Sequence, residues 1–352
     1  MKKRIAFVGA GALGGYVGGW FAHAGLKVTL IDPWPGHVET IRRSGLELDG
    51  VTPGEKVVVR PRILHVTEAQ SLAKTPVDVA FVAMKSYDTA WATELIKPYL
   101  APEGFVVSLQ NCLNEETIAR IVGWGRVAGV VASLISVDLH AEGKIRRTVA
   151  KGGDKHTVFR VGEAHGRITA RVEELVQWFR GIDSAKATGN LWGERWAKLV
   201  QNGMGNGVSA ATGLTSSDCT RDPAIRRFQI ALAGEGVRVG QALGYSMEKI
   251  RGLDPERLAR ANEGDAAALA EVEAALAPKP GANPRADIQR PSMAQDIRKG
   301  RRTEIEAMNG FIARKGAECG VPAPANAKLT QIVTRVERGE AQPSPALLEL
   351  RA

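Results

Sequence analysis

A glycine-rich hexapeptide near the N-terminus has the spacing of a phosphate-binding turn. Its residues are Gly9-Ala10-Gly11-Ala12-Leu13-Gly14, a GxGxxG pattern that directly follows the apolar run 4–8. Glycines at these places permit a tight turn from a strand into a helix, whose first backbone N–H groups can then meet a pyrophosphate. Asp32 follows at the end of the second apolar run, at the interval from Gly14 that is typical of such sites. The turn and the carboxylate together predict a dinucleotide-binding site.

The residue type at position 32 bears on the choice between the two nicotinamide cofactors. A carboxylate accepts hydrogen bonds from the ribose hydroxyls of NAD and repels the 2′-phosphate of NADP, for which Arg or Lys is typical. Residues 33–37 contain no Arg or Lys, whereas Arg42 and Arg43 lie further along the chain, where they are able to reach a phosphate. We therefore favour NAD and keep NADP as the alternative.

A nicotinamide enzyme that reduces a carbonyl also needs a proton donor near the developing alkoxide. Lys198, Asn202 and Asn206 recur at every fourth position, so they share one face if the helix is continuous. Asn and Gly are poor helix formers, and the glycines within residues 203–207 would let a backbone or a ligand approach closely. We expect this face to line a site. The alternative is a solvated face on which Glu194 pairs with Lys198.

Histidine and cysteine offer no comparable pattern. All six histidines lie between His23 and His165, in predicted loops or at the sheet edge, and no HxxxH or HExxH pair indicates a metal. We expect most of them to be solvated. The three cysteines are far apart and odd in number, which predicts no disulfide framework and favours the reducing cytoplasm. No apolar run is long enough to span a membrane, so we expect no membrane partner.

The composition bounds the number of domains and the partners. A length of 352 residues predicts about two domains. The net charge of +9 suits acidic small molecules or nucleic acid, but no helix-turn-helix, zinc-finger or RNA-binding signature is present and aromatic residues make up only 5%. We therefore expect no nucleic-acid partner, and composition alone does not choose between acidic small molecules and phosphates. A non-catalytic redox sensor that binds NAD(H) is the alternative from another class.

The apolar runs predict an α/β fold with two domains. Residues 1–32 form a strand–helix–strand unit, further buried strands lie at 77–84 and 105–109, and strand-like runs between 130 and 161 predict antiparallel additions at the sheet edge. Beyond residue 167 the pattern is helical. The expected helices are 168–179, 194–203, 224–244, 255–277 and 292–319. We predict a doubly wound sheet domain over 1–185, an all-α domain over 186–338 and a loosely ordered tail over 339–352.

Several separated motifs, in order, resemble the ketopantoate reductase family (2-dehydropantoate 2-reductases). The motifs are the opening GAGALGG, Met84-Lys85-Ser86, Gln110-Asn111, Trp196-Ala197-Lys198-Leu199 with Asn202 and Asn206, Ser292-Met293-Ala294-Gln295-Asp296, and Arg302-Thr303-Glu304-Ile305 with Asn309-Gly310. The resemblance covers nearly the whole chain. It implies an N-terminal Rossmann domain, an all-helical C-terminal domain like that of 6-phosphogluconate dehydrogenase, and a site in the cleft between them. The apolar surface of the helical domain is suited to a dimer interface, so we expect a homodimer.

The resemblance also implies roles for single residues. Lys198 would be the general acid that protonates the substrate carbonyl oxygen as hydride arrives. Asn202 and Asn206 would bind the substrate, and Ser292 its carboxylate. Asn111 and Lys85 would lie near the nicotinamide end and its ribose. Glu304 matches the family's functional glutamate. If residues 292–304 formed one helix, they would rise about 18 Å, so we expect Ser292 at the helix start and Glu304 near the cofactor ribose or Lys198.

Two features depart from the family pattern. Asp32 replaces the basic residue that typically binds the 2′-phosphate of NADPH, and the charged segment 254–290 is long enough to cover or reshape a substrate pocket. The leading hypothesis is therefore an NAD-dependent reductase of a 2-oxo acid, or dehydrogenase of a 2-hydroxy acid. The alternative is an NADPH-dependent 2-dehydropantoate 2-reductase of pantothenate biosynthesis.

Overall fold

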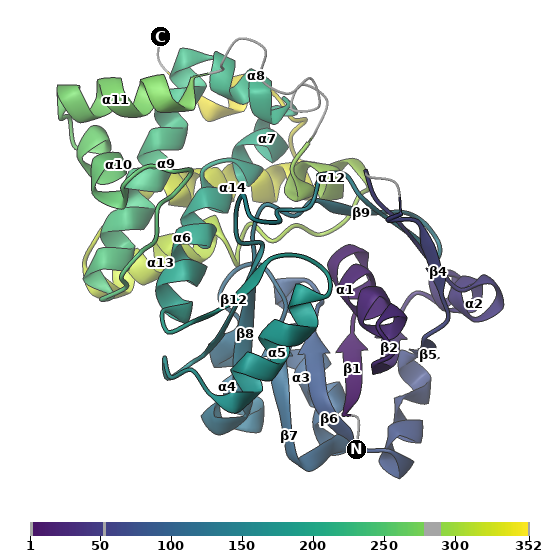
Figure 1. Ribbon diagram of the computed structural model, residues 1–352. Coiled ribbons are helices and arrows are strands. Elements are labelled where there is room, and N and C mark those ends of the chain that lie inside the picture. The colour runs from purple at the N-terminus through teal and green to yellow at the C-terminus, as the bar shows by residue number, and fades with distance from the viewer. Residues whose placement is uncertain (1–2, 52–53, 278–289, 351–352) are drawn as a thin grey trace. The chain divides into compact units, whose positions relative to one another are not determined.

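The computed structural model describes residues 3–51, 54–277 and 290–350. Its internal contacts divide the chain into two compact units, residues 1–191 and 192–352. The first unit is built on a parallel sheet with helices on both faces, and the second is helical (Figure 1). The predicted fold class, a Rossmann-like domain followed by an all-α domain, is confirmed.

The main sheet of the first unit has eight strands in the order β12-β11-β8-β7-β6-β1-β2-β5. Their bounds are β1 Arg4–Val8, β2 Lys27–Asp32, β5 Arg62–His65, β6 Val77–Val82, β7 Leu100–Ser108, β8 Val127–Ala132, β11 Phe159–Glu163 and β12 Ala185–Thr188. Every neighbouring pair is parallel except β8 and β11. The antiparallel β11 confirms the predicted addition beside the parallel strands.

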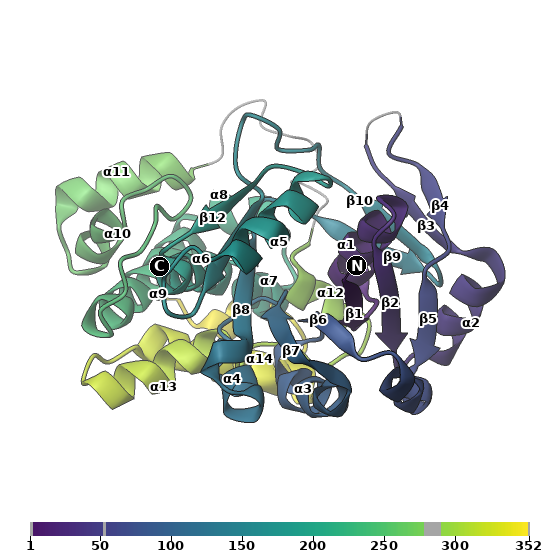
Figure 2. The same ribbon diagram turned by 60° about the horizontal axis from the view of Figure 1, so that its bottom comes forward.

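The helices of the first unit cover both faces of this sheet (Figure 2). Alternate residues of β1 enter two separate cores, because successive side chains of a strand point to opposite faces. Ile5 and Phe7 pack with α1 and α5, whereas Ala6 and Val8 pack with α3 and α4. The helices are α1 Ala12–His23, α2 Pro35–Ser44, α3 Thr89–Ile96, α4 Glu115–Val122 and α5 Ala170–Arg180, with short 3-10 helices η1 Val66–Lys74, η2 Ser86–Asp88, η3 Lys97–Tyr99 and η4 Trp124–Arg126.

A second sheet, in the order β4-β3-β10-β9, packs on the other side of α1. Its strands are β3 Leu46–Asp49, β4 Val57–Val59, β9 Val137–Ala141 and β10 Lys144–Arg147. Runs expected at the edge of the main sheet therefore form part of a separate sheet. The glycines of α1 explain how it fits between the two sheets: a Cβ at Gly18 would come within 2.6 Å of Leu30, and one at Gly15 within 2.5 Å of Ile145.

The second unit consists of helices. They are α6 Leu191–Gly203, α7 Asn206–Thr212, α8 Ser216–Arg221, α9 Pro223–Ala242, α10 Pro255–Asn262, α11 Ala266–Leu276, α12 Ser292–Arg298, α13 Asn309–Cys319 and α14 Pro324–Glu337, with the 3-10 helix η5 Pro345–Leu348. Two predicted helices are each split. The run 255–277 breaks at Gly264, where φ is +94°, and Asp265 caps α11. The run 292–319 breaks after Arg298, with Gly300 at φ +61°.

Two further segments of the second unit bear on the predictions. The described part of the segment 254–290 packs on α9, where Arg238 forms ion pairs with Glu256 and Glu263; residues 278–289 lie outside the described residues. The described residues 339–350 pack on the rest of the second unit, because Ser344 donates its N–H to the carbonyl of Ala211 at 2.9 Å and Leu348 is fully buried. This packing depends on the contact between Ser344 and Ala211, which are far apart in the sequence, so the residue pattern near the C-terminus does not predict it.

Candidate functional site

The glycine-rich turn of the first unit has a shape that only glycine permits at two places. Gly9 has φ +104°, and a Cβ there would come within 2.9 Å of the carbonyl oxygen of Ala83. A Cβ on Gly14 would come within 2.1 Å of the carbonyl oxygen of Gly9. A Cβ on Gly11, in contrast, would meet no atom within 4 Å. Gly9 and Gly14 thus form the turn, and the missing side chain of Gly11 leaves open space on its surface.

Helix α1 begins at this open space. Gly11 is its N-cap, and no side chain caps it. The N–H groups of the first turn, including those of Ala12 and Leu13, have no acceptor within a helix, and the helix dipole places partial positive charge beside them. Because the adjoining space is open and the donors are backbone groups, the residues fit the pyrophosphate of a dinucleotide.

Asp32 is held at the end of β2 by two backbone N–H groups. Ala10 donates to its Oδ2 at 2.8 Å and Trp34 to its Oδ1 at 2.9 Å, and the residue is only 7% exposed. Each carboxylate oxygen keeps a second lone pair, so the group is still able to accept a hydrogen bond from a hydroxyl. The bond to Ala10 was not predicted. It makes Asp32 a support of the glycine-rich turn as well as a candidate ribose ligand.

Lys85 and Asn111 follow β6 and β7, at the carboxyl edge of the sheet that also carries the glycine-rich turn. The N–H of Ala83 bonds to the carbonyl of Val8, which aligns the ends of β6 and β1. Gln110 donates to the carbonyl of Met84 at 2.9 Å and so ties together the loops after β6 and β7. Ligands of open α/β sheets bind at this edge. The first unit therefore brings Lys85, Asn111, Asp32 and the turn to one edge.

The polar face of the second unit is divided between two helices. Lys198 and Asn202 lie on α6, which ends at Gly203, whereas Asn206 begins α7 after a break with Gly205 as its N-cap. The predicted helix 194–203 ends where α6 ends, and the condition of a continuous helix through Asn206 is not met. All three side chains are half-buried. Lys198 and Asn202 share a face of α6 as predicted, while Trp196, Leu199 and Val200 on that helix are fully buried.

The glycines around this break serve helix packing. A Cβ on Gly207 would come within 2.9 Å of Leu329 of α14, and one on Gly203 within 3.3 Å of the amide nitrogen of Asn309. Asn309 also donates to the carbonyl of Gly203 at 3.0 Å. Glycine at these positions thus allows α13 and α14 to approach α6 and α7, which is the close approach of chain segments that the sequence predicts.

Ser292 and Glu304 stand in different local structures. Ser292 is exposed and is the first residue of α12, as expected. Glu304 is only 5% exposed and lies in the irregular segment between α12 and α13. That segment is held by Thr303, whose N–H and hydroxyl both bond to Glu337 of α14, at 2.7 and 2.6 Å. Because the helix is not continuous, the separation of about 18 Å that continuity would require does not apply.

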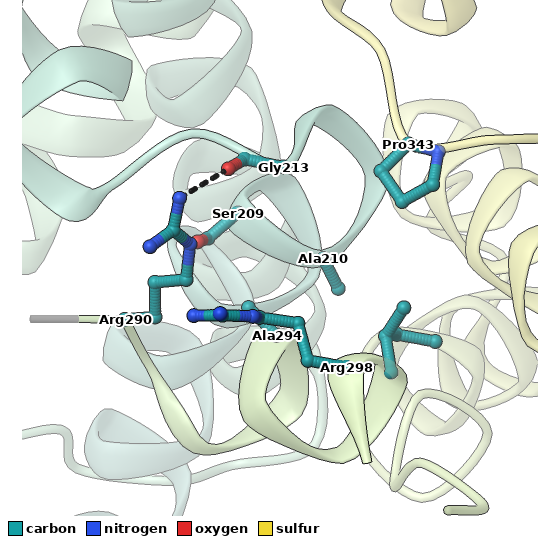
Figure 3. A pocket seen from close by; sticks show the side chains of 8 residues that line it. Ser209, Ala210, Gly213, Arg290, Ala294, Arg298 and Pro343 are labelled. Atoms are coloured by element: carbon teal, nitrogen blue, oxygen red, sulfur yellow. Dashed lines mark hydrogen bonds between the residues drawn. The ribbon is translucent and has the colours of Figure 1, made fainter. Parts of the chain in front are cut away.

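A cavity of about 280 Å³ in the second unit lies beside α7 and α12 (Figure 3). Arg290, which precedes α12, and Arg298, at its end, both line it. Arg290 donates to the carbonyl of Gly213 at 3.2 Å. None of the residues predicted to bind substrate or cofactor lines this cavity. Its two arginines give this part of the second unit positive charge.

We also searched the described residues for a metal site and for a membrane-spanning helix. Within them, no group of three or more His, Cys, Asp or Glu side chains is placed to hold a metal ion. A search of those residues likewise finds no helix with the length and apolar character needed to cross a membrane. Most of the six histidines are exposed or partly exposed, as expected, and His37 is the exception because it is fully buried. The sequence alone offers no reason to assign a role to His37.

Comparisons with known proteins agree with this architecture. The family model described as "Ketopantoate reductase PanE/ApbA" matches residues 5–159, and the model described as "Ketopantoate reductase PanE/ApbA C terminal" matches residues 190–337. A 2-dehydropantoate 2-reductase of Archaeoglobus fulgidus is 29% identical over 96% of this chain and 99% of its own length. One of Halobacterium salinarum is 27% identical over 95% and 99%.

Solved structures give the same result. A PanE/ApbA family ketopantoate reductase of Ralstonia eutropha JMP134 is 27% identical, with a TM-score of 0.75 over 96% of this chain and 99% of that one. A D-mandelate dehydrogenase solved with NADH and anilino(oxo)acetate shares the fold, with 22% identity and a TM-score of 0.78 over 99% and 100% of the two chains. The chain therefore belongs to the ketopantoate reductase family of oxidoreductases, which use a nicotinamide cofactor.

Proposed function

We propose that this protein transfers hydride between NAD(H) and a small 2-oxo or 2-hydroxy acid. The observation that carries the choice of NAD is Asp32, whose carboxylate is fixed at the end of β2 by the N–H groups of Ala10 and Trp34. A fixed acceptor there favours ribose hydroxyls and repels a 2′-phosphate. The D-mandelate dehydrogenase solved with NADH supports the proposal, because the same fold holds that cofactor there.

The residues of this chain divide the work in the proposed reaction. When bound, the nicotinamide supplies or takes the hydride. The N–H groups of the first turn of α1 bind the pyrophosphate, and Asp32, Lys85 and Glu304 contribute to the ribose contacts. Asn111 lies near the nicotinamide end. These roles, apart from that of the turn, rest on the family resemblance and on the place of each residue in its unit.

Lys198 is the proposed general acid. In reduction its ammonium group donates a proton to the carbonyl oxygen of the substrate, and its positive charge stabilises the alkoxide that develops there. In oxidation the neutral amine takes the proton of the hydroxyl. Asn202 and Asn206 hold the substrate by hydrogen bonds, and the hydroxyl of Ser292 binds its carboxylate. Glu304 orients Lys198 or the ribose.

The second candidate is NADPH-dependent reduction of 2-dehydropantoate. The curated relatives favour it, because those of Archaeoglobus fulgidus and Halobacterium salinarum bear that name. Rates of NADH and NADPH oxidation, measured against ketopantoate and against 2-oxo acids with small, branched and aromatic side chains, separate the two. Efficient turnover of NADH with another acid supports the first candidate. Equal or better use of NADPH by the wild-type protein contradicts the preference for NAD.

A substitution tests Asp32 directly. Asp32→Asn keeps the shape and removes the charge, but its NH2 group cannot accept, so one of the bonds from Ala10 and Trp34 is lost for either cofactor. The readout is therefore the ratio of kcat/KM for NADPH to that for NADH, which should rise about tenfold, equivalent to about 1.4 kcal/mol. Asp49→Asn, at the end of β3, is the matched control and should leave the ratio unchanged. An Asp32→Asn variant with the wild-type ratio would show that this carboxylate does not select the cofactor.

The remaining expectations concern assembly and location. We propose a cytoplasmic homodimer, in keeping with the dimeric ketopantoate reductase of Staphylococcus aureus, which shares the fold at a TM-score of 0.68. Light scattering after gel filtration, over a range of protein concentrations, measures the oligomeric state. A mass of 37.7 kDa at every concentration would contradict a dimer.

A further inference from the structure

His37 lies on α2 and is fully buried behind the glycine-rich turn. Its Nε2 is 3.0 Å from the carbonyl oxygen of Ala10, and its Nδ1 is 2.9 Å from the backbone nitrogen of Gly143. A backbone N–H can only donate, so Nδ1 is the unprotonated nitrogen of the ring. Nε2 therefore carries the proton and donates it to Ala10. Both ring nitrogens are occupied, and the tautomer is set by the β9–β10 turn that contains Gly143.

The contacts of Ala10 fix the backbone on both of its sides. Its N–H donates to Asp32, and its carbonyl accepts from His37. That carbonyl belongs to the same trans peptide group as the N–H of Gly11, and the two bonds of such a group point in opposite directions. Because His37 draws the carbonyl toward the interior, the N–H of Gly11 points away from the buried ring. Its direction is thus set by a side chain of the next helix along the chain, α2.

The ring of His37 is itself held from several sides. Trp34 stacks on it with ring centroids 5.6 Å apart and planes inclined by 17°. The β9–β10 turn is anchored by the bond from the N–H of Glu47 to the carbonyl of Gly143, at 2.8 Å, and by the bond from Thr40 to Glu142, at 3.3 Å. A shift of the imidazole would disturb its stack on Trp34 or its bonds to Ala10 and Gly143. The donor that holds Ala10 is therefore rigid.

We propose that His37 is a positioning residue for the cofactor: its Nε2–H holds the Ala10 carbonyl inward so that the N–H of Gly11 faces the pyrophosphate. The open space beside Gly11 is where a phosphate has room to approach. The proposal rests on the nicotinamide chemistry of the family and is independent of the preference for NAD over NADP. It can therefore fail while the proposed function holds, and the reverse is also true.

Two substitutions separate the two bonds of the ring. In His37→Gln the amide nitrogen reaches about as far as Nε2 and still donates to Ala10. In His37→Asn the amide oxygen stands near the place of Nδ1, so it still accepts from Gly143 but no donor reaches Ala10. Both variants lose one ring bond and the stack on Trp34, so their thermal midpoints should fall by similar amounts. They differ in the hydrogen bond to the Ala10 carbonyl, which only His37→Gln keeps.

The measurements are KM for the preferred cofactor, kcat at saturating cofactor, and the dissociation constant of that cofactor by titration calorimetry. We expect His37→Asn to raise KM and the dissociation constant about tenfold, with kcat within twofold of wild type. His37→Gln should restore both constants to within about twofold. Wild-type affinity in His37→Asn overturns the proposal. Equal losses of affinity in the two variants also overturn it, because they would show that the ring acts through packing alone.

Discussion

The two units offer a ligand different kinds of chemical group. In the first unit the donors that we propose for the pyrophosphate are backbone N–H groups of the turn and of α1, and the buried side chains of Asp32 and His37 hydrogen-bond to that backbone. In the second unit the candidate groups are side chains, Lys198 and Asn202 on α6 and Asn206 on α7, all half-buried. A substitution at the glycine-rich turn should therefore act through volume and backbone direction, whereas one at Lys198, Asn202 or Asn206 should remove a reacting or binding group.

Two helix N-termini show the same difference. The first turn of α14 is closed by the chain, because Glu235 of α9 accepts from the N–H groups of Ala325 and Asn326 at 2.8 and 3.0 Å. The N-terminus of α1 has no side-chain cap and adjoins open space at Gly11. A structural helix end obtains its hydrogen bonds within the protein, whereas the end of α1, which no side chain caps, is the one that we propose binds a ligand.

Removal of Lys198 should give the largest effect on the reaction. Lys198→Ala deletes the proposed proton donor, so kcat should fall by about a hundredfold or more, while the dissociation constant for the cofactor stays within about twofold. Steady-state rates and calorimetric titration with the cofactor measure the two quantities. Lys249→Ala, at an exposed lysine of the same unit, is the matched control and should be as active as wild type. Near-normal turnover in Lys198→Ala would remove this residue from the acid role.

A side chain that fills the open space at Gly11 should give the next largest effect. It should weaken cofactor binding and leave kcat at saturating cofactor nearly unchanged. Gly11 has φ −64°, which any residue adopts, and a Cβ there meets no atom, so Gly11→Val should fold normally. Its side chain would occupy the space proposed for the pyrophosphate and raise the cofactor KM by tenfold or more. Thermal unfolding and steady-state kinetics check both halves of this expectation.

Gly14→Ala is the comparison variant, and it should differ from Gly11→Val by losing stability as well. Its Cβ would come within 2.1 Å of the carbonyl oxygen of Gly9, so the protein should lose stability along with cofactor affinity. If Gly11→Val binds the cofactor as wild type does, the open side of the turn is not the phosphate site. The contrast between a structural glycine and a ligand-facing glycine would then fail.

Local rules explain why much of the first unit is predictable from sequence. The turn at Gly9 needs a positive φ, and Gly14 needs close contact with the carbonyl of Gly9; both demands act within the hexapeptide and appear directly as GxGxxG. Asp32 is equally visible because it ends a buried strand at the expected interval. Its bond to Ala10 is not, because it depends on how the strand and the turn meet in space.

The missed features depend on contacts between distant parts of the chain. His37 ends the Pro- and Gly-containing run 33–37, and its ring accepts a hydrogen bond from a partner far along the chain, Gly143. The end of α12 is fixed in part by the bonds from Thr303 to Glu337, which no period in residues 292–319 reveals.

Removal of the cap at the N-terminus of α14 should have the smallest effect, and that effect should be on the stability of the fold. Glu235→Ala leaves the N–H groups of Ala325 and Asn326 without their acceptor, which should cost about 2 kcal/mol in the free energy of unfolding near pH 5. For a unit of this size the thermal midpoint should fall by about 4 to 8 °C. Calorimetric unfolding measures it. An unchanged midpoint would mean that this helix end needs no cap, and the distinction from α1 would lose its basis.

The cost of that substitution should also depend on pH. Burial raises the pKa of the Glu235 carboxyl above its usual range, although the N–H groups of Ala325 and Asn326 partly offset this. Between the usual and the raised pKa the folded protein binds more protons than the unfolded chain, so the contribution of Glu235 to stability is full at low pH and declines as pH rises through the raised value. Glu235→Ala should therefore cost less at pH 8 than at pH 5. Glu235→Gln cannot ionise and should lack the wild-type decline; the same decline in that variant would place the titrating group elsewhere.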